Sequence, residues 1–184
     1  MRQENSRGLP DDLEIKSKRK KKKYGYLVRF LLKTAFIFGS GAMILIFVFE
    51  PYRITGNSMS PFVRDGDLGV FYKLEDYYLN DVILYDDDQG NRRVGRIVAT
   101  GGQTVDFPED GGYEVNGYQP TEEVPYETYA ATGVSVTYPL DLGEDEYFVL
   151  NDFRPITADS REMGSIRRQQ IRGKLLFLLR RRNF

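Results

Sequence analysis

Ser58 is the residue of this chain best placed to act as a nucleophile. It lies in the stretch Ile54-Thr55-Gly56-Asn57-Ser58-Met59-Ser60-Pro61, soon after a long apolar segment. The glycine before the serine and the proline after it bend and stiffen the backbone, which can present a hydroxyl at the end of a strand. A serine hydroxyl attacks a carbonyl efficiently only when a neighbouring group takes its proton. Ser58 therefore needs a partner that the rest of the chain must supply.

The composition leaves few residues that could be this general base. The chain has no histidine, and after Glu50 its only lysines are Lys73 and Lys174. Arginine stays protonated at physiological pH, so it can stabilise an oxyanion but cannot abstract a proton. The carboxylates of Asp152 and Asp159 are bases in principle, although arginines beside them would lower their pKa.

Five motifs in one order, from Pro51 to the C-terminus, resemble the boxes of type I signal peptidases, which are membrane-anchored Ser/Lys proteases. The motifs are Ser58-Met59-Ser60-Pro61, Gly66-Asp67, the segments 95–103 and 151–164, and Ile171-Arg172-Gly173-Lys174. The resemblance implies a mainly β protein, with an antiparallel β domain of the signal-peptidase type behind a single N-terminal transmembrane helix. It also implies that Ser58 holds the nucleophile position and that Thr157 supplies the orienting hydroxyl.

The departures from the family pattern predict a catalytically silent protein. Gly95 stands where the family carries its general-base lysine, and Asn151 replaces a glycine beside that lysine. In the family pattern the carboxylates of a structural network pair with arginines, which weakens them as bases. The network residues are Asp152, Arg154, Asp159 and Arg161, with Arg154 and Arg161 as the pairing arginines. The alternative is an active signal peptidase that cleaves exported preproteins with Ser58 and an atypical base.

A substrate groove is also implied by the resemblance. Its expected lining residues are Tyr52, Ile54, Met59, Arg93 and Val94. An extended peptide would bind there by strand addition, with backbone hydrogen bonds giving affinity and shallow pockets giving selectivity. Strand addition does not require a lysine at position 95. The alternative interpretation is that these side chains merely complete the hydrophobic core.

A signal-peptidase-like chain without its lysine is similar to the SipA-type accessory proteins of sortase-dependent pilus assembly in Gram-positive bacteria. This resemblance implies an exported protein substrate or a pilin subunit as partner, with the pilus sortase and membrane lipid as further partners. No cofactor is expected. Asp86-Asp87-Asp88 could suggest calcium, but we interpret it as part of a solvated hairpin turn and predict no metal site.

Charge is distributed unevenly along the chain. Residues 1–33 hold eleven Lys or Arg against four Asp or Glu, including the basic run Lys16–Lys23. A nucleic-acid patch or a nuclear signal would also be basic, but a basic run before an apolar segment is typical of a cytoplasmic membrane flank. We predict a disordered basic cytoplasmic tail over residues 1–28.

The apolar segment predicts a membrane anchor over residues 29–49, because it approaches the length that a hydrocarbon core requires. A buried helix of a soluble core or a cleaved signal peptide are the alternatives. The anchor predicts a single-pass protein of the cell membrane, with residues 50–184 forming an extracellular β domain.

From Tyr52 onward, short apolar runs separated by Asp, Asn and Gly predict antiparallel strands. An acidic, tyrosine-rich insertion over residues 106–146 holds eleven Asp or Glu and five Tyr. It is either a solvated hairpin region or a recognition face for a basic or amphipathic protein. Its charge disfavours nucleic acid as a partner.

Overall fold

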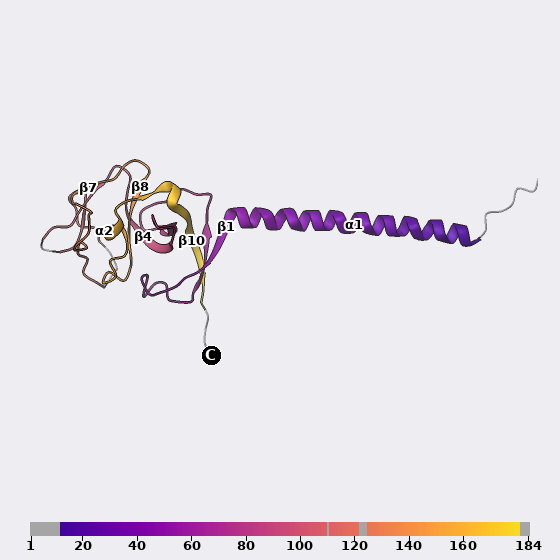
Figure 1. Ribbon diagram of the computed structural model, residues 1–184, viewed down its shortest axis with the longest axis horizontal. Helices are drawn as coiled ribbons and strands as arrows, with labels where there is room; N and C mark the ends of the chain where they lie inside the picture. The colour runs from indigo at the N-terminus through magenta and orange to yellow at the C-terminus, as the bar shows by residue number, and fades with distance from the viewer. Residues whose placement is uncertain (1–11, 110, 122–124, 181–184) are drawn as a thin grey trace, which may run out of the picture. The chain divides into compact units, whose positions relative to one another are not determined.

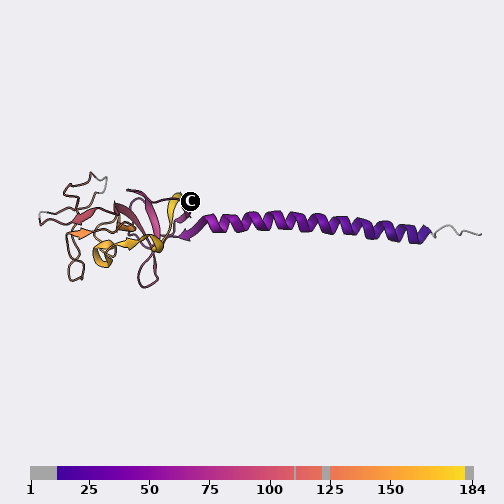
Figure 2. The ribbon, with the colours of Figure 1, turned by 90° about the horizontal axis from the view of Figure 1, so that it is seen from above.

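The computed structural model describes residues 12–109, 111–121 and 125–180. The chain divides into two compact units, Met1–Ile46 and Phe47–Phe184. Helix α1, Asp12–Val48, runs unbroken in both views (Figure 1 and Figure 2). The second unit contains the last two residues of this helix and every strand that the structure describes.

The segment Tyr24–Val48 of α1 is long and apolar enough to cross a membrane. Its apolar side chains are exposed all round the helix, with Phe36 and Met43 each 76% exposed. A helix whose apolar side chains are exposed on every face is suited to lipid rather than water. The structure thus agrees with one membrane-spanning helix, although the apolar segment starts before the predicted residue 29.

The predicted disordered tail over residues 1–28 is wrong from Asp12 onward, where the chain is helical. Leucine, glutamate, lysine and arginine dominate this stretch, and all four have high intrinsic helix propensity. Residues 1–11 of the predicted tail lie outside the described part of the chain. The predicted anchor also ends differently, because Phe49 belongs to the first strand.

The second unit is built from two antiparallel sheets, which confirms the predicted fold class. Seven strands form the larger sheet in the order β1-β2-β10-β3-β4-β8-β9, and three form the smaller in the order β6-β5-β7. The strands are β1 Phe49–Arg53, β2 Leu68–Tyr72, β3 Val82–Asp86, β4 Arg92–Thr100, β5 Thr104–Asp106, β6 Glu114–Val115, β7 Leu140–Asp141, β8 Glu146–Leu150, β9 Ile166–Arg167 and β10 Ile171–Leu179. Helix α2, Ser160–Met163, and the 3-10 helix η1, Arg168–Gln170, lie between β8 and β10 in the sequence.

Strand β3 supports the site because side chains pack against both of its faces. Its side chains alternate, so that Leu84 packs with Val94 on one face and Tyr85 packs with Val149 on the other. Both faces are buried, which is why the strand reads as a continuous apolar run. The turn from β3 to β4 is closed by the N–H of Asp87, which donates to the carbonyl of Asn91 at 2.9 Å.

Strand β10 is only partly a core strand. Ile171 and Gly173 are buried, whereas Leu176 and Leu179 are 56% and 54% exposed. The apolar run at the end of this strand is therefore only partly buried. Its first half pairs with β3 and its second half with β2, so each half has a neighbouring strand on one side.

The predicted acidic insertion, residues 106–146, contains the short strands β6 and β7 and much irregular chain. Asn116 and Gly117 have φ of 54° and 77°, as an Asn-Gly hairpin turn requires, and the bridge Val115–Tyr118 closes that turn. The tyrosines of this insertion differ in how far they are buried. Tyr113 packs in the core between the sheets, whereas Tyr118 is 79% exposed.

Candidate functional site

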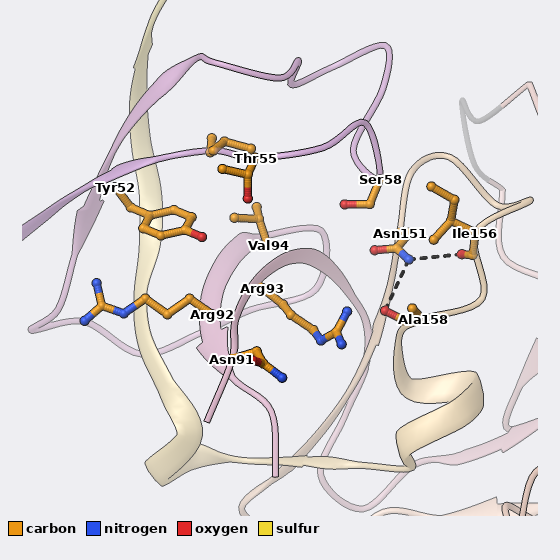
Figure 3. Close-up of a pocket in the computed structure, with 11 residues that line it drawn as sticks. Tyr52, Thr55, Ser58, Asn91, Arg92, Arg93, Val94, Asn151, Ile156 and Ala158 are labelled. Carbon is orange, nitrogen blue, oxygen red and sulfur yellow. Dashed lines mark hydrogen bonds between the residues drawn. The ribbon is translucent and has the colours of Figure 1, made fainter. Parts of the chain in front are cut away.

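A pocket of about 230 Å³ opens beside Ser58 (Figure 3). Its residues come from the end of β1 and the loop after it, from the start of β4, and from the chain that follows β8. They are Tyr52, Ile54, Thr55, Ser58, Asn91, Arg92, Arg93, Val94, Asn151, Ile156 and Ala158. The structure therefore brings the predicted nucleophile together with four of the five predicted groove residues.

The loop that carries Ser58 connects β1 to β2 and is closed at its base. The N–H of Ile54 donates to the carbonyl of Asp67 at 2.8 Å. Gly56 has a φ of +82°, a conformation that favours glycine, and its N–H donates to Asp65 Oδ1 at 2.8 Å. The glycine thus allows the turn that precedes the serine.

A second contact fixes the loop against the chain that follows β8. The N–H of Phe153 donates to the carbonyl of Ser58 at 2.9 Å. Asn151 lies two residues before Phe153, and its side-chain amide donates to the carbonyls of Ile156 and Ala158 at 3.0 and 3.5 Å (Figure 3). These bonds hold the wall of the pocket that faces Ser58.

None of the side chains that line this pocket can act as a general base near neutral pH. The lining contains two arginines and two asparagines but no His, Lys, Asp or Glu. Among the residues that the structure describes, none accepts a hydrogen bond from the Ser58 hydroxyl. The described lining of the pocket therefore offers no side chain that could take the proton of Ser58.

Gly95 does not line the pocket and lies under a closed surface. A Cβ placed on Gly95 would sit 2.5 Å from Cγ1 of Val149 and 3.4 Å from Cε1 of Tyr85. Both neighbours are fully buried. The space in which a side chain at position 95 would start is therefore filled.

Tyr85 contributes to this closed surface with its ring and brings a buried hydroxyl. Burial raises the pKa of Tyr85, and the nearby carboxylate of Asp159 raises it further. The phenol is neutral at any physiological pH, so it cannot act as a base in the form of a phenolate.

The carboxylates named in the sequence are both held by arginines. Asp159 accepts bonds from Nη2 and Nε of Arg161 at 2.7 and 2.9 Å, and both residues are buried. Asp152 accepts bonds from Nη2 and Nε of Arg96 at 2.6 and 2.8 Å. The predicted pairing of Asp152 with Arg154 is wrong, because Arg96 reaches Asp152 from the neighbouring strand β4.

Two further predicted site residues lie away from the pocket. The hydroxyl of Thr157 donates to Glu162 rather than turning toward position 95. Met59 is 1% exposed, belongs to the core cluster of Ile54 and Val94, and is not among the residues that line the pocket.

Arg92 and Arg93 are directed to opposite ends of the pocket (Figure 3). Nη1 of Arg92 lies 3.0 Å from Oε1 of Glu50, and its guanidinium carbon lies 6.0 Å from the centre of the Tyr52 ring. The guanidinium of Arg93 is directed toward the end that holds Asn151 (Figure 3). Two cations therefore flank the space beside Ser58.

Asp87 anchors Arg93 from outside the pocket. Its Oδ2 accepts a bond from Nε of Arg93 at 2.7 Å, and its Oδ1 accepts one from the backbone N–H of Asn91 at 2.8 Å. Burial alone would raise the pKa of Asp87, but the bonds from Arg93 and Asn91 outweigh it and lower the pKa to about 2. Asp87 is thus ionised and orients Arg93 at all relevant pH values.

Sequence reasoning missed part of the lining. Three of the missed residues are next to predicted ones in the sequence, so the expected strands and the turn beside them could have indicated that they line the pocket. These residues are Thr55, Asn91 and Arg92. Ile156 and Ala158 lie within a recognised motif, but nothing in the motif shows that their chain folds back toward Ser58.

A family model described as "Signal peptidase, peptidase S26" matches residues 27–179. The chain belongs to this family. It is 32% identical over 150 residues to "Signal peptidase I" of Bacillus licheniformis, covering 74% of this chain and 79% of that protein. It is 30% identical over 151 residues to "Signal peptidase IB" of Staphylococcus aureus strain COL, covering 71% of this chain and 78% of that protein.

A solved signal peptidase also resembles this member of the signal peptidase family. The crystal structure of a signal peptidase I from Enterococcus faecalis V583 has 26% sequence identity and a TM-score of 0.47. The match covers 56% of this chain and 99% of that chain.

Proposed function

We propose that this member of the signal peptidase family binds exported proteins at the membrane surface without cleaving them. The observation that carries the proposal is the composition of the pocket beside Ser58, whose lining offers no proton acceptor. A peptidase of the Ser/Lys type needs a base within hydrogen-bond reach of the nucleophile. The packing of Val149 over Gly95 supports the same view, since it leaves no room for a lysine there.

The groove supports a role in binding. Tyr52, Ile54 and Val94 give it apolar walls, and the serine loop and the start of β4 border it on two sides. An extended segment of an exported protein can use the backbone of β4 for hydrogen bonds and these walls for selectivity. In this proposal the partner is a pilin subunit, which the protein holds or presents to the pilus sortase.

The proposed location is the outer face of a bacterial cytoplasmic membrane. The segment Tyr24–Val48 would cross the bilayer, and the basic run Lys16–Lys23 would remain on the cytoplasmic side. The β unit would then stand where exported chains emerge. A fusion of a periplasm- or surface-active reporter to the C-terminus tests this orientation.

Cleavage and capture by the purified full-length protein in detergent test the proposed function. A pilin precursor with its signal peptide is mixed with the wild type and with Ser58→Ala, and both should leave it uncut. A photo-crosslinking residue at Thr55, in the pocket, should capture the precursor, whereas the same residue at Gln89, in the outer turn, should not. Cleavage by the wild type that Ser58→Ala abolishes would establish instead an active peptidase with an atypical base.

A further inference from the structure

We infer that Arg93 makes the pocket beside Ser58 a receptor for the carboxylate side chain of an extended peptide. This inference rests on the proposed function, because it names the chemistry of the segment that the groove would hold. Arg93 lies on β4 two residues before Gly95, so the two positions share one face of the strand. The pocket thus has a fixed cation on the face where a titratable lysine would otherwise stand.

The guanidinium of Arg93 has donors left for a ligand. Its Nε is committed to Asp87 at 2.7 Å, but its two terminal nitrogens have no hydrogen-bond partner among the residues that the structure describes. A guanidinium presents its donors in a rigid fork that matches the two oxygens of a carboxylate. Its side chain is 34% exposed, so a ligand can reach it from the pocket.

The charge around Arg93 favours an anionic ligand. No Asp or Glu lines the pocket, and Arg92 at its other end is paired with Glu50, which leaves Arg93 as the cation directed into the space beside Ser58. Asp87 holds Arg93 from the outer turn and does not enter the lining. Ser58 and Asn91 add polar groups that can donate hydrogen bonds to the same oxygens.

The strands beside the pocket favour an extended ligand whose carboxylate comes from a side chain. Strand β1 is the edge strand of the larger sheet. Strand β4 pairs with β3 from Arg92 onward but with β8 only from Arg96 onward, so no described strand occupies the other side of residues 92–95. A peptide strand that pairs there alternates its side chains between two faces. One face would meet the apolar residues Ile54 and Val94, and the other would meet Arg93.

Fluorescence anisotropy with labelled nonapeptides on the full-length protein in detergent tests this inference. The peptides alternate threonine and valine, with a central glutamate or a central glutamine and an amidated C-terminus. The wild type should bind the glutamate peptide at least about 10-fold more tightly, the size of one charge-assisted hydrogen bond. Arg93→Gln should bind both peptides equally, and Arg93→Lys should retain part of the preference because it keeps the charge without the fork.

Arg172→Gln is the matched control. Arg172 pairs with Asp86 at the end of β3 but does not line the pocket, so its loss should leave the preference unchanged. A third peptide, with a central glutamine and a free C-terminal carboxylate, should bind like the amidated glutamine peptide. Tight binding of this third peptide would overturn the inference in favour of a C-terminal carboxylate.

Two other results separate this inference from the proposed function. If the wild type binds the glutamate and glutamine peptides equally while Thr55 still captures the precursor, the carboxylate receptor is wrong and the binding role stands. If Arg93→Gln and Arg93→Lys both keep the full preference for glutamate, Arg93 is not the receptor. If neither peptide binds and Thr55 captures nothing, both proposals are wrong.

Discussion

Val149 occupies the position into which a side chain on Gly95 would grow. The distance from Val149 Cγ1 to a Cβ built on Gly95 is 2.5 Å, which is shorter than any ordinary contact between carbon atoms. Valine is stiff at χ1, so its methyl group cannot easily rotate away. The absence of a side chain at position 95 therefore leaves the space that Val149 on β8 fills. Substitutions at the two positions should have coupled effects on stability.

The first prediction concerns stability. Gly95→Ala should destabilise the β domain by about 1–3 kcal/mol, the usual effect of overpacking a core. In a Val149→Ala background the same change should have little effect, because the clash is gone. Urea unfolding of the wild type, both single variants and the double variant measures the coupling, which should be about 0.5–3 kcal/mol. Additive effects would contradict the contact.

The second prediction concerns activity. Gly95→Lys alone should give no cleavage of a preprotein, since Val149 prevents the lysine from adopting an unstrained rotamer. Gly95→Lys combined with Val149→Ala should give cleavage that depends on Ser58. Val149→Ala alone and the double variant with Ser58→Ala are the controls, and both should be inactive. Full activity of Gly95→Lys alone would show that the space over Gly95 opens readily.

Much of this arrangement could be predicted from the sequence. Short apolar runs separated by Asp, Asn and Gly predict β3 and β4, and Asn116-Gly117 predicts its hairpin, because local chain chemistry determines these features. Ser58 could also be identified from the sequence, because it lies in a short motif in which Gly56 allows the turn of the loop.

The packing across the sheet could not be predicted in this way. Asp152 pairs with Arg96, which is 56 residues away in the chain, and only the register of β4 against β8 brings them together. The contact between Val149 and position 95 also depends on this register. A motif gives the order of residues along the chain, but it does not give the neighbours that a side chain meets across a sheet.

The third prediction concerns the buried ion pair of Asp159 and Arg161. Asp159→Asn should destabilise the domain by about 3–5 kcal/mol, because it leaves a buried arginine without its counter-charge. Asp86→Asn breaks the more exposed pair with Arg172 and should cost at most about 1 kcal/mol. Chemical unfolding at neutral pH measures both variants. Equal effects of the two substitutions would contradict a special role for burial.

The fourth prediction concerns acid stability. The pKa of Asp87 is about 2 in the folded protein, below the value of about 3.9 for an unperturbed aspartate. The stabilisation from this shift is present above about pH 4 and is lost as the pH falls toward 2, where the carboxylate takes up a proton. Thermal unfolding between pH 7 and pH 2 should therefore show a shallower acid decline for Asp87→Asn than for the wild type. Glu144→Gln, an exposed change elsewhere, should leave the decline unaltered.

The fifth prediction uses two glycines with the same backbone strain to separate stability from function. Gly56 and Gly133 have φ of +82° and +74°, and a Cβ on either would meet no atom within 4 Å. Alanine at either position should thus cost about 1–2 kcal/mol through backbone strain alone. Only Gly56→Ala should reduce capture of a precursor from Thr55, because only Gly56 shapes the loop that presents Ser58. Equal loss of capture in Gly133→Ala would mean that the groove responds to overall stability, whereas retained capture in Gly56→Ala would mean that the serine loop does not form the binding site.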